Sequence, residues 1–193
     1  MNPTWITLNP QDHGHQGWQK FTHYLFATQD HLCPVQMAEL TQILPWYPLA
    51  LLPSQSPSEQ PPLRHLVALL GTHPGHNLYV TPQGQWQAPY VPAYYRGYPF
   101  SLNTQGELQF NTASGLLSAD ASDDRVTPFY TQAESGDDIQ PTKILKQIKG
   151  FLHKCREGLG LTQRLVNQLQ HHQLLENWTI ALKNGQQTLK LQG

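Results

Sequence analysis

The sequence predicts an α+β fold in which a bent, mostly antiparallel sheet packs against a short N-terminal helix and a long C-terminal helical segment. Two observations predict this fold. First, apolar side chains recur at helical spacing over residues 142–171 and, over a shorter length, over residues 34–44. Second, short apolar runs separated by turn residues fill the rest of the chain. The chain has 193 residues, of which 38% are hydrophobic, so we expect one core and a single domain over residues 1–193.

Composition argues against several classes of function. Charged residues make up only 13% of the chain and the net charge is -1, so no basic surface for nucleic acid or anionic lipid is indicated. No apolar run approaches the roughly 18 residues that span a bilayer. The first residues lack the basic flank and apolar stretch of a signal peptide, so we expect a cytoplasmic protein. Cys33 and Cys155 are expected to be reduced and packed, although a disulfide between them stays open.

The N-terminal part predicts two strands and a helix. Residues 5–8 alternate weakly and favour a short strand, and residues 21–28 favour a second strand that is buried on both faces. The helix is expected over residues 34–44, because Pro34 suits a first helical turn, an apolar stripe follows it, and Pro45 ends the pattern.

The next segments predict further strands and loops. Residues 46–52 read as an extended buried strand, residues 54–62 as a loop rich in proline and serine, and residues 66–70 as a core strand. Residues 108–110 favour another short strand. Residues 112–140 are rich in Ser, Asp, Thr and Gly, and predict a flexible surface excursion whose Pro128-Phe129-Tyr130 stretch docks back onto the domain.

The C-terminal part carries the strongest patterns. Residues 142–171 predict either one bent helix or two helices end to end, because Gly158 and Gly160 weaken the middle of the pattern. A hairpin is expected next, with Asn184-Gly185 as a two-residue turn. Its strands, residues 178–183 and 186–191, pair their apolar side chains across the hairpin.

The run from Gly75 to Phe100 combines few charges with several prolines and aromatic residues. Residues 77–80 favour a strand, residues 81–84 a turn, and Trp86 the start of a second extended segment, so a hairpin is predicted. Pro89 and Pro92 cannot lie in a central strand. Residues 90–100 are therefore expected at a sheet edge or in a winding aromatic loop.

This run resembles the SapC family of bacterial proteins. The resemblance rests on four motifs: Gly75-His-Asn-Leu-Tyr-Val, Gly84-Gln-Trp86, Tyr90-Val-Pro92-Ala and Arg96-Gly-Tyr98-Pro99-Phe100. It extends over most of the chain, through Pro34-Val-Gln-Met-Ala-Glu39, Tyr47-Pro48, Val67-Ala-Leu-Leu-Gly71 and the helical region with its exit at Trp178. Two departures stand out. Leu117-Ser-Ala-Asp120 replaces the family's Cys-Ile-Asp, and the family's further helical stretch after the hairpin is missing, which suggests a shortened member.

The resemblance implies little about chemistry. Some SapC-like proteins are linked with surface layers, and others occur with oxygenase-like or tryptophan-halogenase-like proteins and outer-membrane receptors. A protein partner could therefore be a co-encoded modifying enzyme. No catalytic residue of the family is established, so the resemblance assigns none here.

Metal and nucleophile chemistry have weak candidates in the sequence. His13-Gly-His15 and His73-x-x-His76 are two histidine pairs, whereas a structural zinc site needs four ligands and an iron(II) triad needs a carboxylate with two histidines. We expect no metal and no cofactor. Cys33 precedes a predicted helix and lies near His31, so a reactive thiol is conceivable, whereas Cys155 falls on an apolar helix face and should be inert.

Binding is the better supported class of function. The candidate binding residues are Trp86, Tyr90, Tyr94, Tyr95, Arg96 and Tyr98. Aromatic residues and arginine are enriched at interaction hot spots, and prolines keep such a segment stiff; the competing interpretation is that these rings complete the core. We therefore expect a non-enzymatic accessory protein that binds a peptide or protein partner. The alternatives are a metal-assisted oxygenase-like enzyme and a structural protein of a surface layer, and the oligomeric state stays open.

Overall fold

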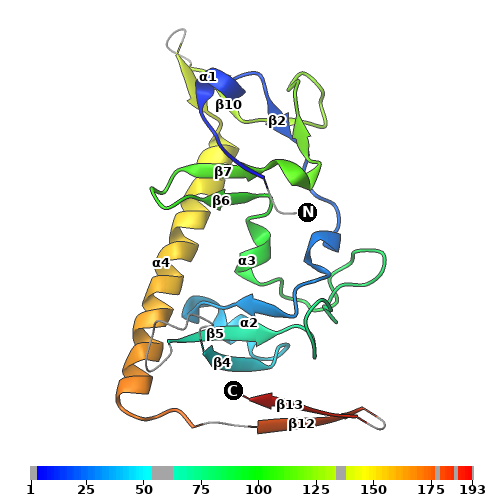
Figure 1. Ribbon diagram of the computed structural model, residues 1–193. Helices are drawn as coiled ribbons and strands as arrows, with labels where there is room; N and C mark the ends of the chain where they lie inside the picture. Colours follow the sequence, from blue (N-terminus) through cyan, green and yellow to red (C-terminus); the bar gives the residue numbers. More distant parts are fainter. Residues whose placement is uncertain (1–3, 54–62, 134–137, 177–178, 185–186, 193) are drawn as a thin grey trace.

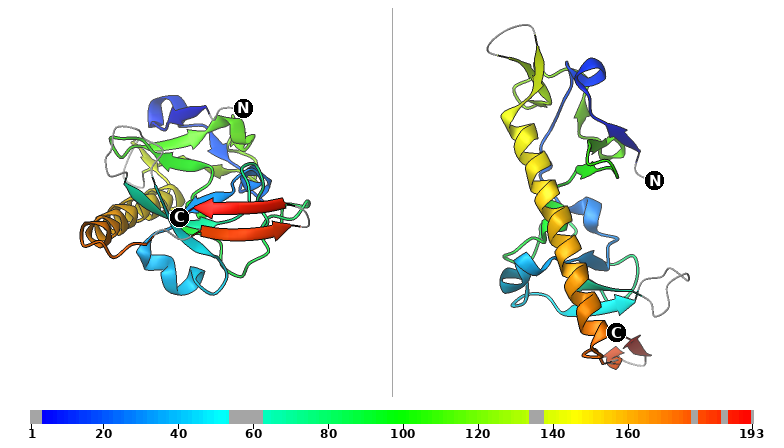
Figure 2. Two further views of the ribbon diagram at one scale, coloured as in Figure 1. Left: turned by 60° about the horizontal axis from the view of Figure 1, so that its bottom comes forward. Right: turned by 90° about the vertical axis from the view of Figure 1, so that its left-hand side faces the viewer.

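The computed structural model describes residues 4–53, 63–133, 138–176, 179–184 and 187–192 (Figure 1). Its fold is α+β, as predicted, with antiparallel strands and a long C-terminal helix. The strands are divided among small sheets that lie along the helix α4 (Lys143–His171), and do not form one continuous sheet (Figures 1 and 2). None of the helices in the described part of the chain is both long and apolar enough to cross a membrane.

The first half of α4 packs against two small sheets and an aromatic core. One sheet contains, in spatial order, β1 (Trp5–Thr7), β7 (Leu108–Asn111) and β6 (Phe100–Leu102); the other contains β8 (Leu117–Ser118), β2 (Gly17–Trp18) and β9 (Thr127–Pro128). Trp18 stacks on Phe129 with ring centroids 5.2 Å apart, and Phe110 meets Phe129 edge-on at 5.4 Å. Leu145 of α4 closes this cluster, which we call the upper core.

The second half of α4 packs against a separate sheet. That sheet contains β3 (Leu32–Pro34), β5 (Arg64–Leu69) and β4 (Leu49–Pro53), all antiparallel. The cluster beneath it, which we call the lower core, is formed by the buried residues Ala27, Cys33, Val35, Ile43, Tyr47, Ala68, Leu70, Val80 and Tyr95. Between the two cores lies α3 (Ala93–Arg96), a short helix within the aromatic run (Figure 1). The aromatic run therefore bridges the two cores.

The helix predicted over residues 142–171 is confirmed as one helix. The Thr142 hydroxyl caps it by accepting a hydrogen bond from the Leu145 amide at 3.3 Å. Gly158 does not break it. A Cβ at Gly158 would lie 2.0 Å from the Gln36 side-chain oxygen, so glycine lets the helix approach the residue-36 turn closely. Tertiary packing therefore accounts for a glycine that weakens the helix locally.

The helix predicted over residues 34–44 starts later than expected. Pro34 ends β3, where it pairs with Val67, so the first residues of the predicted helix are extended. Gln36 caps η2 (Met37–Glu39), a 3₁₀ turn that leads into α2 (Leu40–Ile43). The pairing of β3 with β5 outweighs the preference of Pro34 for a first helical turn.

The strand predicted over residues 21–28 is wrong, and this segment contains the 3₁₀ helix η1 (Leu25–Ala27). The rings of Phe21 and Phe26 lie 5.4 Å apart, centroid to centroid, in an edge-on contact. The Asn77 side-chain amide donates to the Ala27 carbonyl at 2.9 Å. A strand would place the rings of Phe21 and Phe26 on opposite faces, whereas here they pack on one another.

The predicted hairpin in the aromatic run is reduced to a turn with a single bridge. Val80 and Trp86 form an isolated antiparallel bridge, and no longer strand forms at residues 77–80. The turn is as predicted, because Gly84 has a φ of +80° and its amide donates to the Thr81 carbonyl at 2.8 Å. The remaining run winds through α3 to β6, as the prolines indicate.

The described parts of residues 112–140 form a series of short elements. Apart from β8 and β9 they are η3 (Thr112–Ser114), β10 (Tyr130–Gln132) and β11 (Ile139–Pro141), the last two paired. α1 (Pro10–His13) lies close to β11. Phe129 is fully buried in the upper core, so the predicted docking is confirmed. The predicted flexibility of this segment stays a prediction.

The C-terminal hairpin pairs β12 (Thr179–Asn184) with β13 (Gln187–Gln192). Ile180 lies opposite Leu191, and Leu182 opposite Leu189, so the apolar positions pair across the hairpin as predicted. The predicted turn position of Asn184 is wrong, because Asn184 is the last residue of β12 and pairs with Gln187; the other predicted turn residue, Gly185, lies outside the described residues. The loop predicted at residues 54–62 also lies outside them.

Candidate binding cavity

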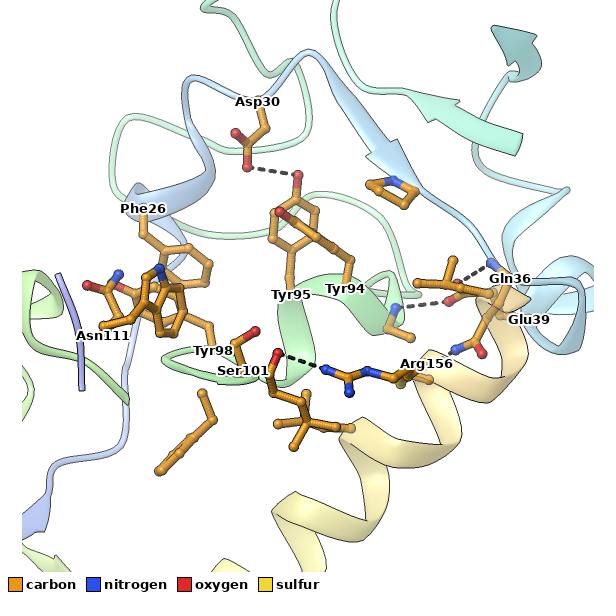
Figure 3. A pocket seen from close by; sticks show the side chains of 18 of the residues that line it. Phe26, Asp30, Gln36, Glu39, Tyr94, Tyr95, Tyr98, Ser101, Asn111 and Arg156 are labelled. Carbon is orange, nitrogen blue, oxygen red and sulfur yellow. Dashed lines mark hydrogen bonds between the residues drawn. The ribbon is translucent and has the colours of Figure 1, made fainter. Parts of the chain in front are cut away.

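A cavity of about 740 Å³ opens between the two cores beside α4 (Figure 3). Segments far apart in the sequence form its wall: β1, the stretch from η1 to η2, the run from α3 to β6, the end of β7 and the middle of α4. Aromatic side chains in the lining are Trp5, Phe26, Tyr94, Tyr95, Tyr98 and Phe100; polar or ionisable ones are Asp30, Gln36, Glu39, Ser101, Asn111, Cys155 and Arg156. The cavity therefore combines ring surfaces with a few hydrogen-bonding groups.

Glu39 holds one wall of the cavity in place. Its side chain is only 4% exposed. One carboxylate oxygen accepts from the Gln36 amide at 3.1 Å, and the other accepts from the Tyr90 hydroxyl at 2.8 Å and the Ala93 amide at 2.9 Å. A buried carboxylate needs such donors to replace water. Glu39 therefore ties the start of η2 to the start of α3 (Figure 3).

Arg96 extends this network toward the surface. Its guanidinium donates to the Tyr90 hydroxyl at 3.0 Å, the same hydroxyl that donates to Glu39. The guanidinium carbon also lies 5.3 Å from the ring centroids of Tyr90 and Phe151. Burial is the main cause that raises the pKa of the Tyr90 phenol to about 12, and the neighbouring Glu39 carboxylate adds to it. Tyr90 is therefore a neutral donor that links the two charges.

Asp30 lies at another side of the cavity, below the turn that follows η1. It is half-buried, and its carboxylate accepts a hydrogen bond from the Tyr95 hydroxyl at 3.1 Å (Figure 3). Burial raises the pKa of the Asp30 carboxyl above its ordinary value of 3.8, while the Tyr95 hydroxyl and the nearby His31 act in the opposite direction. Ionisation of Asp30 in this position is therefore less favourable than in water.

Replacing Asp30 with asparagine should raise the stability of the protein at neutral pH. A carboxyl whose pKa is raised by folding favours the folded state below pH 3.8, and that contribution is lost as the pH rises through the raised pKa. Asparagine keeps an oxygen for the Tyr95 hydroxyl and carries no charge. Thermal unfolding between about pH 3 and pH 7 should show the Asp30→Asn midpoint above the wild-type midpoint at neutral pH, with the difference shrinking in acid. A wild-type protein that is the more stable one at neutral pH would contradict this assignment.

The α4 wall carries Leu152, Cys155 and Arg156. Arg156 donates through one guanidinium nitrogen to the carbonyls of Leu102 at 2.8 Å and Asn103 at 2.7 Å, which fixes the end of β6 to the helix. The Gln36 side-chain amide donates to the Cys155 sulfur at 3.6 Å. A Cβ at Gly97 would lie 2.6 Å from a methyl of Leu152, so the glycine after α3 allows the aromatic run to pack directly on α4.

The predicted binding residues separate into two groups. Tyr94, Tyr95 and Tyr98 line the cavity. Trp86, Tyr90 and Arg96 are not part of its lining and support it from outside. The Trp86 indole donates to the Tyr47 hydroxyl at 2.7 Å, and that hydroxyl donates to the Tyr90 carbonyl.

Other lining residues did not stand out in the sequence. They include Trp5, Asp30 and Arg156, which no local pattern connects with the aromatic run. Glu39 closes a capping box with Gln36 at the start of η2, but glutamine is not one of the residues that mark such a box in a sequence. Its bonds to Tyr90 and Ala93 join distant segments, so no local pattern predicts them.

Comparison with known proteins matches the SapC family over residues 8–193. The chain belongs to the SapC family. The matched region includes every residue of the cavity lining except Trp5. No curated protein and no solved structure matches the chain. The cavity of this SapC-family protein must therefore be interpreted from its own residues.

The other candidate chemistries of this SapC-family protein find little support. Cys33 is free but fully buried, and burial together with the Glu39 and Asp30 carboxylates raises its pKa far above the ordinary value, so it is a packed thiol. His13 is buried against the backbone of Asn9, and the rings of His73 and His76 stack at 5.3 Å. Within the described ranges, no three His, Cys, Asp or Glu side chains are grouped to hold a metal ion.

Proposed function

We propose that this SapC-family protein is a non-enzymatic accessory protein that binds a peptide segment of a partner protein in the cavity. The observation that carries the proposal is that the stiff aromatic run supplies three tyrosines, Tyr94, Tyr95 and Tyr98, to one cavity wall. A volume of about 740 Å³ suits a few residues of a peptide, since ligand sites in proteins measure about 300–1,000 Å³.

Tyr94 is the residue best placed for contact with a partner. Its side chain lines the cavity and is 58% exposed, whereas Tyr95 beside it is buried in the lower core. The two rings meet edge-on with centroids 5.1 Å apart, so Tyr95 supports Tyr94 from behind. An exposed tyrosine on a rigid base provides contact area with little loss of side-chain freedom on binding.

The residues behind the wall explain why it is rigid. Glu39 fixes the first residue of α3, and Arg96 and Tyr90 extend that network on the outer side. A preorganised wall lowers the entropy cost of binding. The roles of Trp86, Tyr90 and Arg96 are thus to position the tyrosines that touch the peptide.

A peptide selection tests this proposal. A random peptide library displayed on phage is selected on the full chain, and the recovered peptides are measured by calorimetry. We expect Tyr94→Ala to weaken their binding at least about tenfold. Trp46→Ala is the matched control, because the Trp46 side chain is 49% exposed and does not line the cavity; this variant should bind as the wild type does.

A second variant and a second measurement complete the test. Ala113 is exposed and lines the cavity, so Ala113→Trp should obstruct the peptide without disturbing a core. Peptides that bind equally well to the wild type, Tyr94→Ala and Ala113→Trp would remove the cavity as the binding site. Mass spectrometry of the recovered peptides checks the non-enzymatic part, since a changed peptide mass after incubation would show catalysis.

A further inference from the structure

We infer that the end of the cavity around Asp30 recognises a cationic side chain, lysine or arginine, of the bound peptide. The inference rests on the proposed function and names the chemistry of its ligand. It is carried by two features of the same cavity wall: an array of aromatic rings and a half-buried carboxylate beside it (Figure 3).

The rings form a connected array. Phe26 and Tyr98 stack with ring centroids 3.7 Å apart and planes 6° from parallel. Phe26 also contacts Tyr95, at 6.3 Å, and Tyr95 meets Tyr94 edge-on at 5.1 Å. All four residues line the cavity. The faces of aromatic rings carry partial negative charge, and they attract ammonium and guanidinium groups most strongly where water is excluded.

Asp30 adds a full charge to this array. Its carboxylate accepts from Tyr95, and within the described residues it forms no ion pair. Burial makes its ionised form less favourable, and the protein supplies only part of the charge compensation that water would give. A ligand cation would supply the missing counter-charge.

The other ionised groups of the lining are already engaged. The Glu39 carboxylate accepts from three donors and is deeply buried. Arg156 lies on a different side of the cavity from Asp30, where it donates to two main-chain carbonyls (Figure 3). A cation that enters the cavity therefore finds its favourable position at Asp30, away from the guanidinium of Arg156.

Two small probes test the charge requirement directly on the full wild-type chain. Nα-acetyl-lysine-N-methylamide carries an ammonium group, and Nα-acetyl-norleucine-N-methylamide is its uncharged counterpart. We expect the lysine compound to shift the ring signals of Tyr94 and Tyr98 in NMR spectra, with an affinity at least about tenfold higher than that of norleucine. Equal affinity of the two compounds would overturn the inference, and this comparison needs no variant.

Asp30→Asn then assigns the effect to one residue. This variant should lose the preference for lysine over norleucine. Asp124→Asn is the matched control, because Asp124 is exposed and lies outside the lining. This substitution changes the net charge of the protein by the same amount as Asp30→Asn. The control should keep the preference. A lysine preference that survives in Asp30→Asn would place the cation elsewhere.

The selected peptides separate this inference from the proposed function. Peptides that depend on Tyr94 but lack lysine and arginine, and that bind Asp30→Asn unchanged, would overturn the inference and leave the proposed function standing. Failure to recover any peptide that depends on Tyr94, although the lysine compound binds at Asp30, would overturn the proposed function instead.

Discussion

Replacing Glu39 with alanine should lower the free energy of unfolding by about 3–5 kcal/mol. The substitution removes the acceptor of three hydrogen bonds at once and leaves the Gln36 amide, the Tyr90 hydroxyl and the Ala93 amide without it. Each buried donor left without a partner costs about 1–3 kcal/mol, and water that enters the space recovers part of this. Urea unfolding of the variant and the wild type measures the difference.

Two further variants show whether the hydrogen bonds cause the loss. Glu39→Gln preserves the shape but presents an amide nitrogen where the carboxylate accepted bonds, so it should lose roughly half as much stability as alanine does. Glu107→Ala is the control, because Glu107 is exposed and should cost less than about 1 kcal/mol. A loss below about 1 kcal/mol for Glu39→Ala would mean that the network does not hold the cavity wall.

Replacing Gly71 with alanine should destabilise the protein by about 2–4 kcal/mol. A Cβ at this position would lie 1.8 Å from the carbonyl oxygen of His76, and backbone cannot rotate away as the end of a side chain can. The same turn is fixed by a hydrogen bond from the Leu78 amide to the Leu70 carbonyl at 2.8 Å. The chain that leads from β5 into the aromatic run would therefore have to move.

Gly150→Ala is the matched control for Gly71→Ala. Gly150 lies in α4, and a Cβ there meets no atom within 4 Å. Because alanine favours a helix over glycine by about 1 kcal/mol, this variant should be more stable than the wild type by about that amount. Chemical denaturation should thus give shifts of opposite sign for the two variants. Shifts of the same sign would refute the steric explanation.

The sequence predicts the elements whose signal is local. The long helix has a capping threonine and an apolar stripe, and the tight turn before Trp86 has the glycine that its positive φ requires. Local signals fail where tertiary contacts decide. Residues 21–28 alternate as a strand would, but their rings pack on one another, and Pro34 joins a sheet although its neighbours suit a helix.

The cavity was only partly predictable for the same reason. The density of aromatic residues and prolines marks Tyr94, Tyr95 and Tyr98, because this composition is a local feature that can be read from the sequence alone. It cannot separate these residues from Tyr90, because only the folded chain brings Glu39 to the Tyr90 hydroxyl. No helix or strand is predicted for the segment that contains Asp30, and its place beside the rings follows from the packing of η1 against α3.

The most direct test of the central claim is hydrogen exchange of the full chain with and without a peptide recovered in the selection. The proposed function predicts slower exchange in residues 93–102 and 111–113, both of which contribute to the lining of the cavity. Slower exchange confined to other parts of the chain, with these residues unchanged, would contradict it.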